Sequence, residues 1–265
     1  IQLHPDGQSY LKFYSRGDST DIMNGDFQHP FPGQNWASKT SQQIRDDDSS
    51  WVQTTEGLIR DSVFVHTPTN SSGLTFELKR WKTSSRFSSY HHFKMIFHGR
   101  KIKSNFPLLH QAILTEKKDS LHWLPEALTI IIDKSLKNLT PEPLTINDQL
   151  WNQRLVNHFR NTFARIQSLD DLEEMQNDRV KYIRNNLKPF SVSDSLAEKL
   201  ADKMSIHEEY LQTSLDLDDD TFEIKVLMPG QVVSTNSSSF NRDTLVWSFG
   251  LDSLLNDKFT LRPFP

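Results

Sequence analysis

A stretch of the sequence without acidic residues, 78–115, carries the residue types that bind anions. It holds eight Lys or Arg residues and four His residues, with aromatic residues interleaved. The candidate ligand-binding residues are Lys79, Arg80, Trp81, Arg86, Tyr90, His92 and Lys94. Basic and aromatic side chains on strands suit anionic polymers and lipid headgroups, because the charge attracts the anion and the rings offer stacking surfaces. The same pattern is also typical of a half-buried pair of strands with a solvated cationic face, and both interpretations stay open.

Glycine and cysteine usage excludes several kinds of active site. The sequence has nine glycines, and no two of them are closer than eight positions. Loops that cradle a phosphate need closely spaced glycines. The sequence has no Cys, which excludes a Cys nucleophile and a Cys-ligated zinc. We therefore predict a protein that is not an enzyme and has no cofactor. A hydrolase would need distant Asp, Glu and His residues to assemble, and no spacing supports such a site.

Histidine spacing and net charge argue against two further classes of ligand. His92 and His98 would share a strand face but lie about 20 Å apart along an extended strand, so we predict no metal site. The formal charge of the chain is 30 − 34 = −4, which argues against nucleic acid as a partner. No apolar run approaches the roughly 20 residues that span a bilayer.

The first part of the chain shows patterns typical of strands. Short apolar or alternating runs bounded by turn residues predict strands at 10–14, 62–66, 74–79 and 91–98. In the last of these, alternation would put Phe93, Met95 and Phe97 on one face. The segment 24–50 is interpreted as a long loop, or as structure that the pattern does not identify.

Helical periodicity dominates the middle of the chain. Apolar residues recur every three or four positions and predict four amphipathic helices, at about 125–139, 151–166, 172–187 and 196–211. Alternation typical of strands returns at 222–227 and 244–249.

The order of strands, helices and strands predicts an α+β fold. We expect one antiparallel sheet built from the N- and C-terminal strands, with a large helical insertion. The expected parts are an N-terminal β-rich part at 1–118, a helical insertion at 119–213 and C-terminal strands that complete the sheet at 214–265. Together they would form one composite domain.

The C-terminal unit resembles a known group of proteins. Residues 227–236 read Leu-Met-Pro-Gly-Gln-Val-Val-Ser-Thr-Asn, and 241–247 read Asn-Arg-Asp-Thr-Leu-Val-Trp. A strand ending in Met-Pro-Gly, a short segment reaching Asn, and a second strand carrying Trp resemble the end of bacterial envelope lipoprotein ectodomains. The LppM-type domain of mycobacteria is one example, and uncharacterised lipoproteins of Bacteroides-like bacteria are similar. The resemblance implies possible binding of lipids or glycolipids and no catalytic residue. A Pro-Gly turn between alternating strands is also an ordinary hairpin feature.

These observations favour a non-enzymatic, extracytoplasmic ectodomain with an interaction or assembly role in the cell envelope. The first residue is Ile1 rather than Met, and we expect that a leader preceded it. The resemblance to envelope lipoprotein ectodomains implies that a membrane anchor follows Pro265. The alternative hypothesis is a binding module for anionic lipid or glycolipid that uses the basic and aromatic strand face. The expected partners are an anionic lipid or glycan, or another envelope protein.

Overall fold

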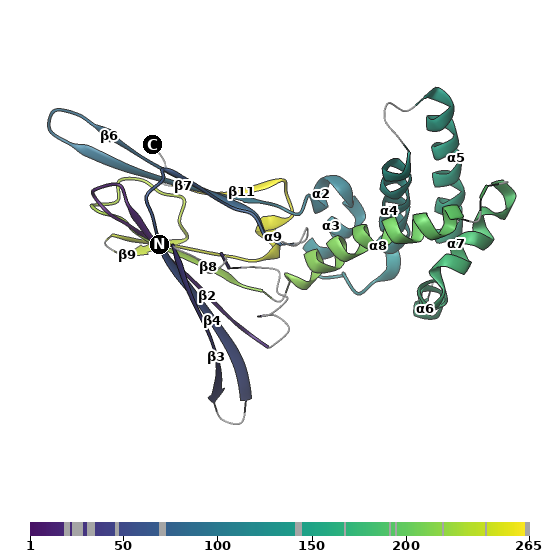
Figure 1. Cartoon of the computed structure of the whole chain (residues 1–265), viewed down its shortest axis with the longest axis horizontal. Coiled ribbons are helices and arrows are strands. Elements are labelled where there is room, and N and C mark those ends of the chain that lie inside the picture. The colour runs from purple at the N-terminus through teal and green to yellow at the C-terminus, as the bar shows by residue number, and fades with distance from the viewer. Residues whose placement is uncertain are drawn as a thin grey trace. The chain divides into compact units, whose positions relative to one another are not determined.

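The structure is a computed structural model in which the chain forms two compact units (Figure 1). The first unit comprises residues 1–100 and 213–265, and the second comprises 101–212. The residues described are 1–18, 22, 29–30, 35–45, 48–68, 73–140, 145–166, 168–190, 192–193, 195–218, 220–241 and 243–262. The helical unit thus begins at 101, earlier than the boundary of 119 expected from the sequence.

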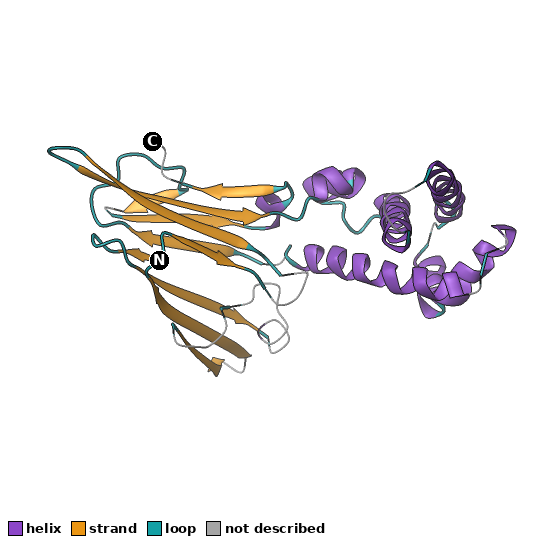
Figure 2. Cartoon of the chain, turned by 45° about the horizontal axis from the view of Figure 1, so that its top comes forward, coloured by secondary structure: helices purple, strands orange, loops and turns teal. Residues whose placement is uncertain are grey.

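The first unit is built from strands that lie in two sheets, coloured orange in Figure 2. In chain order, its elements are β1 Gln2–Leu3, β2 Ser9–Gly17, β3 Trp36–Arg45, β4 Asp48–Ile59, β5 Val63–His66, β6 Phe76–Ser84, β7 Ser89–His98, β8 Phe222–Leu227, β9 Ser239–Asn241, β10 Thr244–Phe249, helix α9 Leu251–Leu254 and β11 Lys258–Leu261. Within the described part of the chain, one sheet has the order β3-β4-β2-β1-β8-β10-β9 and the other β11-β7-β6-β5.

Both sheets combine strands from the two ends of the chain, which confirms the predicted fold class. In the seven-stranded sheet, β1 pairs antiparallel with β2 and parallel with β8, where Gln2 lies opposite Leu227. In the four-stranded sheet, β11 pairs with β7, from Lys258 opposite His98 to Leu261 opposite Met95. The strands therefore form two sheets rather than one, and nearly all of the pairings are antiparallel.

Aromatic side chains join the two sheets in a common core. Ring centroids lie 6.0 Å apart for Phe93 and Trp247 and 5.1 Å apart for Phe97 and Phe249. Phe93, Met95 and Phe97 are all buried, which confirms the alternation predicted for this strand. Burial of large apolar side chains such as these stabilises a fold by about 1.5–3 kcal/mol each.

Two segments differ from the sequence prediction. The interpretation of 24–50 as a loop is wrong for the described part from Trp36 onward, because β3 and β4 form a long hairpin from Trp36 opposite Gly57 to Arg45 opposite Asp48. Most of the remainder of 24–50 lies outside the described residues. Residues 102–114, expected in the β-rich part, form two short helices.

The second unit is helical. Its helices are α2 Ile102–Asn105, α3 Pro107–Leu114, α4 Leu124–Leu139, α5 Ile146–Phe163, α6 Leu169–Asn177, α7 Arg179–Leu187 and α8 Ser195–Asp216, with short 3₁₀ turns at Leu121–Trp123 and Lys188–Phe190. The single helix expected at 172–187 is divided at Asp178, which caps α7 by accepting a hydrogen bond from the Lys181 backbone N–H. No helix in the described residues has the length and apolarity needed to cross a bilayer.

Candidate functional site

Strands β6 and β7 form a two-stranded ribbon at the end away from β11. Their pairing runs from Phe76 opposite Phe97 to Ser84 opposite Ser89. All residues from Trp81 to Tyr90 are exposed, whereas the inward-facing residues near the other end, such as Phe76 and Phe97, are buried. The ribbon is therefore part of the core at one end and surrounded by solvent at the other.

Five of the predicted binding residues share the outer face of this ribbon. Lys79 lies opposite Lys94, Trp81 opposite His92, and Tyr90 opposite Thr83. Residues directly opposite one another in an antiparallel pair point to the same side of the sheet. The structure thus brings Lys79, Trp81, Tyr90, His92 and Lys94 together on one surface, which we call the outer face.

An aromatic stack lies at the centre of the outer face. The rings of Trp81 and His92 are 4.8 Å apart and within 4° of parallel. The hydroxyl of Thr83 on β6 lies 2.9 Å from Nε2 of His92 on β7. This contact fixes the orientation of the imidazole ring. Trp81 is 48% exposed and Tyr90 49% exposed. The outer face therefore offers ordered aromatic surface to a ligand.

Arg80, which was also predicted as a binding residue, lies on the other side of the ribbon from the outer face. Its side chain points to the opposite side from Trp81 and is only 8% exposed. Its guanidinium donates hydrogen bonds to the carbonyls of Ile59 and Asp61 at 2.9 and 2.7 Å, and to the Ser9 hydroxyl. The alternation of Phe76, Leu78 and Arg80 was the signal that could have placed it inward. Arg80 is not part of the outer face.

Arg86 lies in the turn at the tip of the ribbon rather than on either face. The turn is closed by a hydrogen bond from the Ser85 backbone N–H to the Ser88 carbonyl, at 2.7 Å. The Arg86 guanidinium lies 5.7 Å from the ring centroid of Phe87, within the range of a cation–π contact. Phe87 is 91% exposed, so the tip presents a cation beside an unburied aromatic ring.

The charge of the outer face is positive. Lys79 is paired with Glu77 at 2.9 Å. Among the ion pairs of the described residues, none involves Arg86 or Lys94. These two cations are therefore available to an anionic partner.

The segment that carried the sequence resemblance lies next to the same ribbon. Residues 228–234 line a cavity of about 440 Å³ together with Tyr90, His91 and Leu245. Asn236 and Trp247, which belonged to the same motif, make a hydrogen bond that holds this segment in place. The motif therefore has a structural role in this chain.

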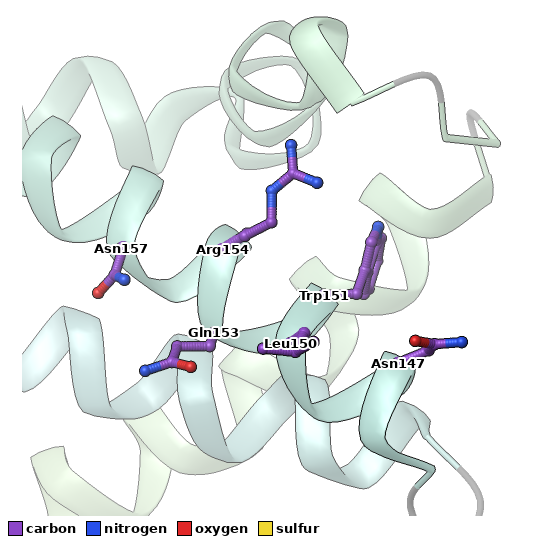
Figure 3. Close-up of a pocket in the computed structure, with 6 residues that line it drawn as sticks. All are labelled: Asn147, Leu150, Trp151, Gln153, Arg154 and Asn157. Carbon is purple, nitrogen blue, oxygen red and sulfur yellow. The ribbon is translucent and has the colours of Figure 1, made fainter.

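A hollow beside helix α5 is a second candidate surface (Figure 3). It has a volume of about 470 Å³ and is lined by side chains of one helix: Asn147, Leu150, Trp151, Gln153, Arg154 and Asn157. Among these described residues, Arg154 is the one titratable group and none is a carboxylate. The hollow therefore brings no acid and base together and is a weaker candidate than the outer face.

A polar cluster in the first unit was not found from the sequence. His29 Nε2 lies 2.8 Å from the Ser15 hydroxyl, and His29 Nδ1 lies 3.0 Å from that of Thr55. This order resembles a nucleophile, a base and an orienting group. However, burial, with the nearby His66, lowers the pKa of His29 to about 4, which makes it a weak base at neutral pH. No cluster of three or more potential metal-ligating side chains occurs in the described part of the chain.

No protein-family model, curated protein or solved structure matches this chain. The resemblance of residues 227–247 to envelope lipoprotein ectodomains therefore stays a prediction.

Proposed function

We propose that this chain is a non-catalytic, extracytoplasmic ectodomain that binds anionic lipid at a membrane surface through the β6–β7 ribbon. The observation that carries the proposal is the exposed combination of cations and aromatic rings on one surface and at the tip of this ribbon. Tyr and Trp rings favour the interfacial region of a bilayer, and basic side chains beside them are attracted to anionic headgroups. The sequence resemblance of 227–247 supports the envelope location and an anchor outside the sequence given.

The tip of the ribbon favours a lipid surface over a soluble glycan. Phe87 is nearly fully exposed and has Arg86 beside it. An apolar ring on a projecting turn can enter the headgroup region while the cation stays at the phosphate level.

Vesicle sedimentation tests the proposal. The chain should bind phosphatidylcholine vesicles that contain phosphatidylglycerol and should not bind pure phosphatidylcholine. Each basic residue near an anionic surface contributes about 1 kcal/mol, so Lys94→Glu or Arg86→Glu should weaken binding by about fivefold or more. Lys39→Glu, an exposed change of the same charge on β3, is the matched control and should bind normally.

Two results would contradict the proposal. One is equal binding to vesicles with and without anionic lipid. The other is an equal loss of binding for Lys39→Glu and Lys94→Glu, which would mean that net charge, and not the outer face, attracts the protein. Phe87→Ser distinguishes insertion of the Phe87 ring into the bilayer from electrostatic attraction to the headgroups. It leaves the charge of the protein unchanged and should still weaken binding to the vesicles.

A further inference from the structure

A second, smaller cavity lies beside the same ribbon. It has a volume of about 210 Å³. Three segments form it: the turn between β1 and β2, the segment 60–62 that follows β4, and the ribbon. The ribbon contributes the inward-facing Arg80, Lys82 and His91, and also Trp81 and His92 of the outer face. The basic side chains of its lining are His4, Arg60, Arg80, Lys82, His91 and His92.

The strand alternation explains why cations gather here. Arg80 is in phase with the buried residues of β6, so Lys82 also points inward, and His91 lies directly opposite Lys82 on β7. The inward face of the ribbon therefore changes from apolar to cationic where the core ends. Arg80 is held by hydrogen bonds to the Ile59 and Asp61 carbonyls.

The turn between β1 and β2 is shaped to close the opposite side of the cavity. His4-Pro5-Asp6-Gly7 forms a tight turn in which the Gly7 N–H donates to the His4 carbonyl at 3.0 Å. Gly7 has a φ of 90°, which a residue with a side chain adopts only with strain. A second hydrogen bond closes the turn next to the pairing of β1 with β2, where the His4 N–H donates to the Gln8 carbonyl at 2.9 Å.

The cations of the cavity outnumber the acids beside them. Among the residues that the structure describes, the lining includes no Asp or Glu. Asp6 and Asp61 lie close enough to favour the charged form of Arg80. No ion pair in the described residues joins a carboxylate to Arg60, Arg80 or Lys82. Burial, together with Lys82 and His92, lowers the pKa of His91, as expected where cations crowd one another without an anion.

We propose that this cavity binds a phosphate monoester group. Arg60, Arg80 and Lys82 are basic side chains, and three imidazoles lie beside them, which suits a group that is dianionic near neutral pH and has three strong acceptor oxygens. The volume is below the roughly 300–1,000 Å³ of cavities for drug-sized ligands, so the cavity suits one small anionic group. The group is either part of a soluble phosphate ester or the headgroup of a phosphatidate lipid.

This inference extends the proposed function but stands without it, because the cavity and the outer face share only His92 among the basic residues named for them, and the test positions Lys82 and Arg60 belong to the cavity alone. Lys82 and Arg60 are exposed, so neutral replacements at these positions should leave the fold intact. Thermal denaturation of each variant checks this. Lys39→Gln on β3 is the matched control for charge.

Calorimetric titration with inorganic phosphate and with glycerol 3-phosphate tests the soluble source. Lys82→Gln and Arg60→Gln should each weaken binding at least tenfold, whereas Lys39→Gln and Lys94→Glu should not change it. Bound phosphate should also raise the pH midpoint of the His91 imidazole proton signals in an NMR titration. Sulfate of equal ionic strength controls for screening.

Vesicles separate the lipid source from the soluble one. If the group belongs to a lipid, vesicles with phosphatidic acid, a monoester, should bind more tightly than vesicles with phosphatidylglycerol at equal surface charge, and Lys82→Gln should remove the difference. Binding of neither phosphate probe nor phosphatidic acid would overturn the inference. So would binding that Lys82→Gln and Arg60→Gln leave unchanged. Binding of the Lys94→Glu variant to phosphatidylglycerol vesicles tests the outer face alone. The two proposals can therefore fail separately.

Discussion

Asn236 accepts a hydrogen bond from the indole N–H of Trp247 at 2.9 Å. The same carboxamide oxygen accepts from the Arg262 backbone N–H at 2.8 Å, and the amide nitrogen donates to the Thr260 carbonyl at 2.9 Å. One side chain therefore connects β10 with the end of β11, and through them the two sheets. The Asn and Trp of the sequence motif are explained by this connection.

We expect Asn236→Ala to destabilise the first unit by about 1–2 kcal/mol. It removes three hydrogen bonds from a side chain that is itself exposed, so water replaces part of what is lost. Chemical denaturation measures the difference. Asn241→Ala, an exposed change on β9, should be close to neutral. Equal effects of both substitutions would mean that the Asn236 contacts do not hold the sheets together.

Substitution of alanine should lower the stability of the fold at Gly99 but not at Gly230. A Cβ on Gly99 would lie 1.9 Å from the Asn256 carbonyl oxygen, in backbone that cannot move away easily. Gly99→Ala should therefore cost about 3 kcal/mol. A Cβ on Gly230 would meet nothing within 4 Å, so Gly230→Ala should be tolerated. Melting temperatures compare the two. A strong loss for Gly230→Ala would show that the Pro-Gly turn needs glycine for another reason.

His29 should make the first unit less stable in acid. Burial lowers its pKa from 6.5 to about 4, so the unfolded chain binds a proton first as the pH falls. Its contribution is complete above pH 6.5 and is lost between pH 6.5 and 4, by up to about 1.4 kcal/mol per pH unit. Urea denaturation across this range should show a shallower dependence for His29→Gln. His98→Gln, at an exposed position, is the matched control substitution.

Vesicle binding should depend strongly on ionic strength. The cations of the outer face are exposed, and at about 1 M salt the screening length falls to about 3 Å. Binding to phosphatidylglycerol vesicles should therefore be lost at high salt. Phe87→Ser should bind more weakly but with the same salt dependence, since it changes no charge. Salt-independent binding would indicate that apolar contact alone drives the association.

The sequence predicted those parts of the fold whose pattern is locally consistent. The alternation of Phe93, Met95 and Phe97 gave both the strand and its buried face. The β3–β4 hairpin was missed because most of its residues are polar and β3 is largely exposed, so no alternation marks a buried face. The sequence predicted one sheet where the structure has two. The pattern could not show this division, because strand order depends on contacts between distant residues such as Gln2 and Leu227.

The sequence could predict the candidate binding residues that lie on the β6–β7 ribbon, but not those that other segments contribute. Residue types and spacing gave the outer face because its members lie close together in the sequence. The smaller cavity needs His4, Arg60 and Lys82 from separate segments, and no local pattern connects them. The inward direction of Arg80 was within reach, since continuing the alternation past Leu78 places it there.

The position of β1 between β2 and β8 means that the seven-stranded sheet can be completed only after β8 has been synthesised. The backbone amine of Ile1 donates to the carbonyl of Lys225, 224 positions away. Among the described strands, β1 is the one that joins the N-terminal strands of the seven-stranded sheet to β8. The nascent N-terminal strands therefore leave the ribosome with an open edge and wait until the helical segment has been translated. Such long-range closure slows folding and prolongs the time in which an unpaired edge can aggregate. We therefore expect the yield of folded protein during expression to depend on chaperones.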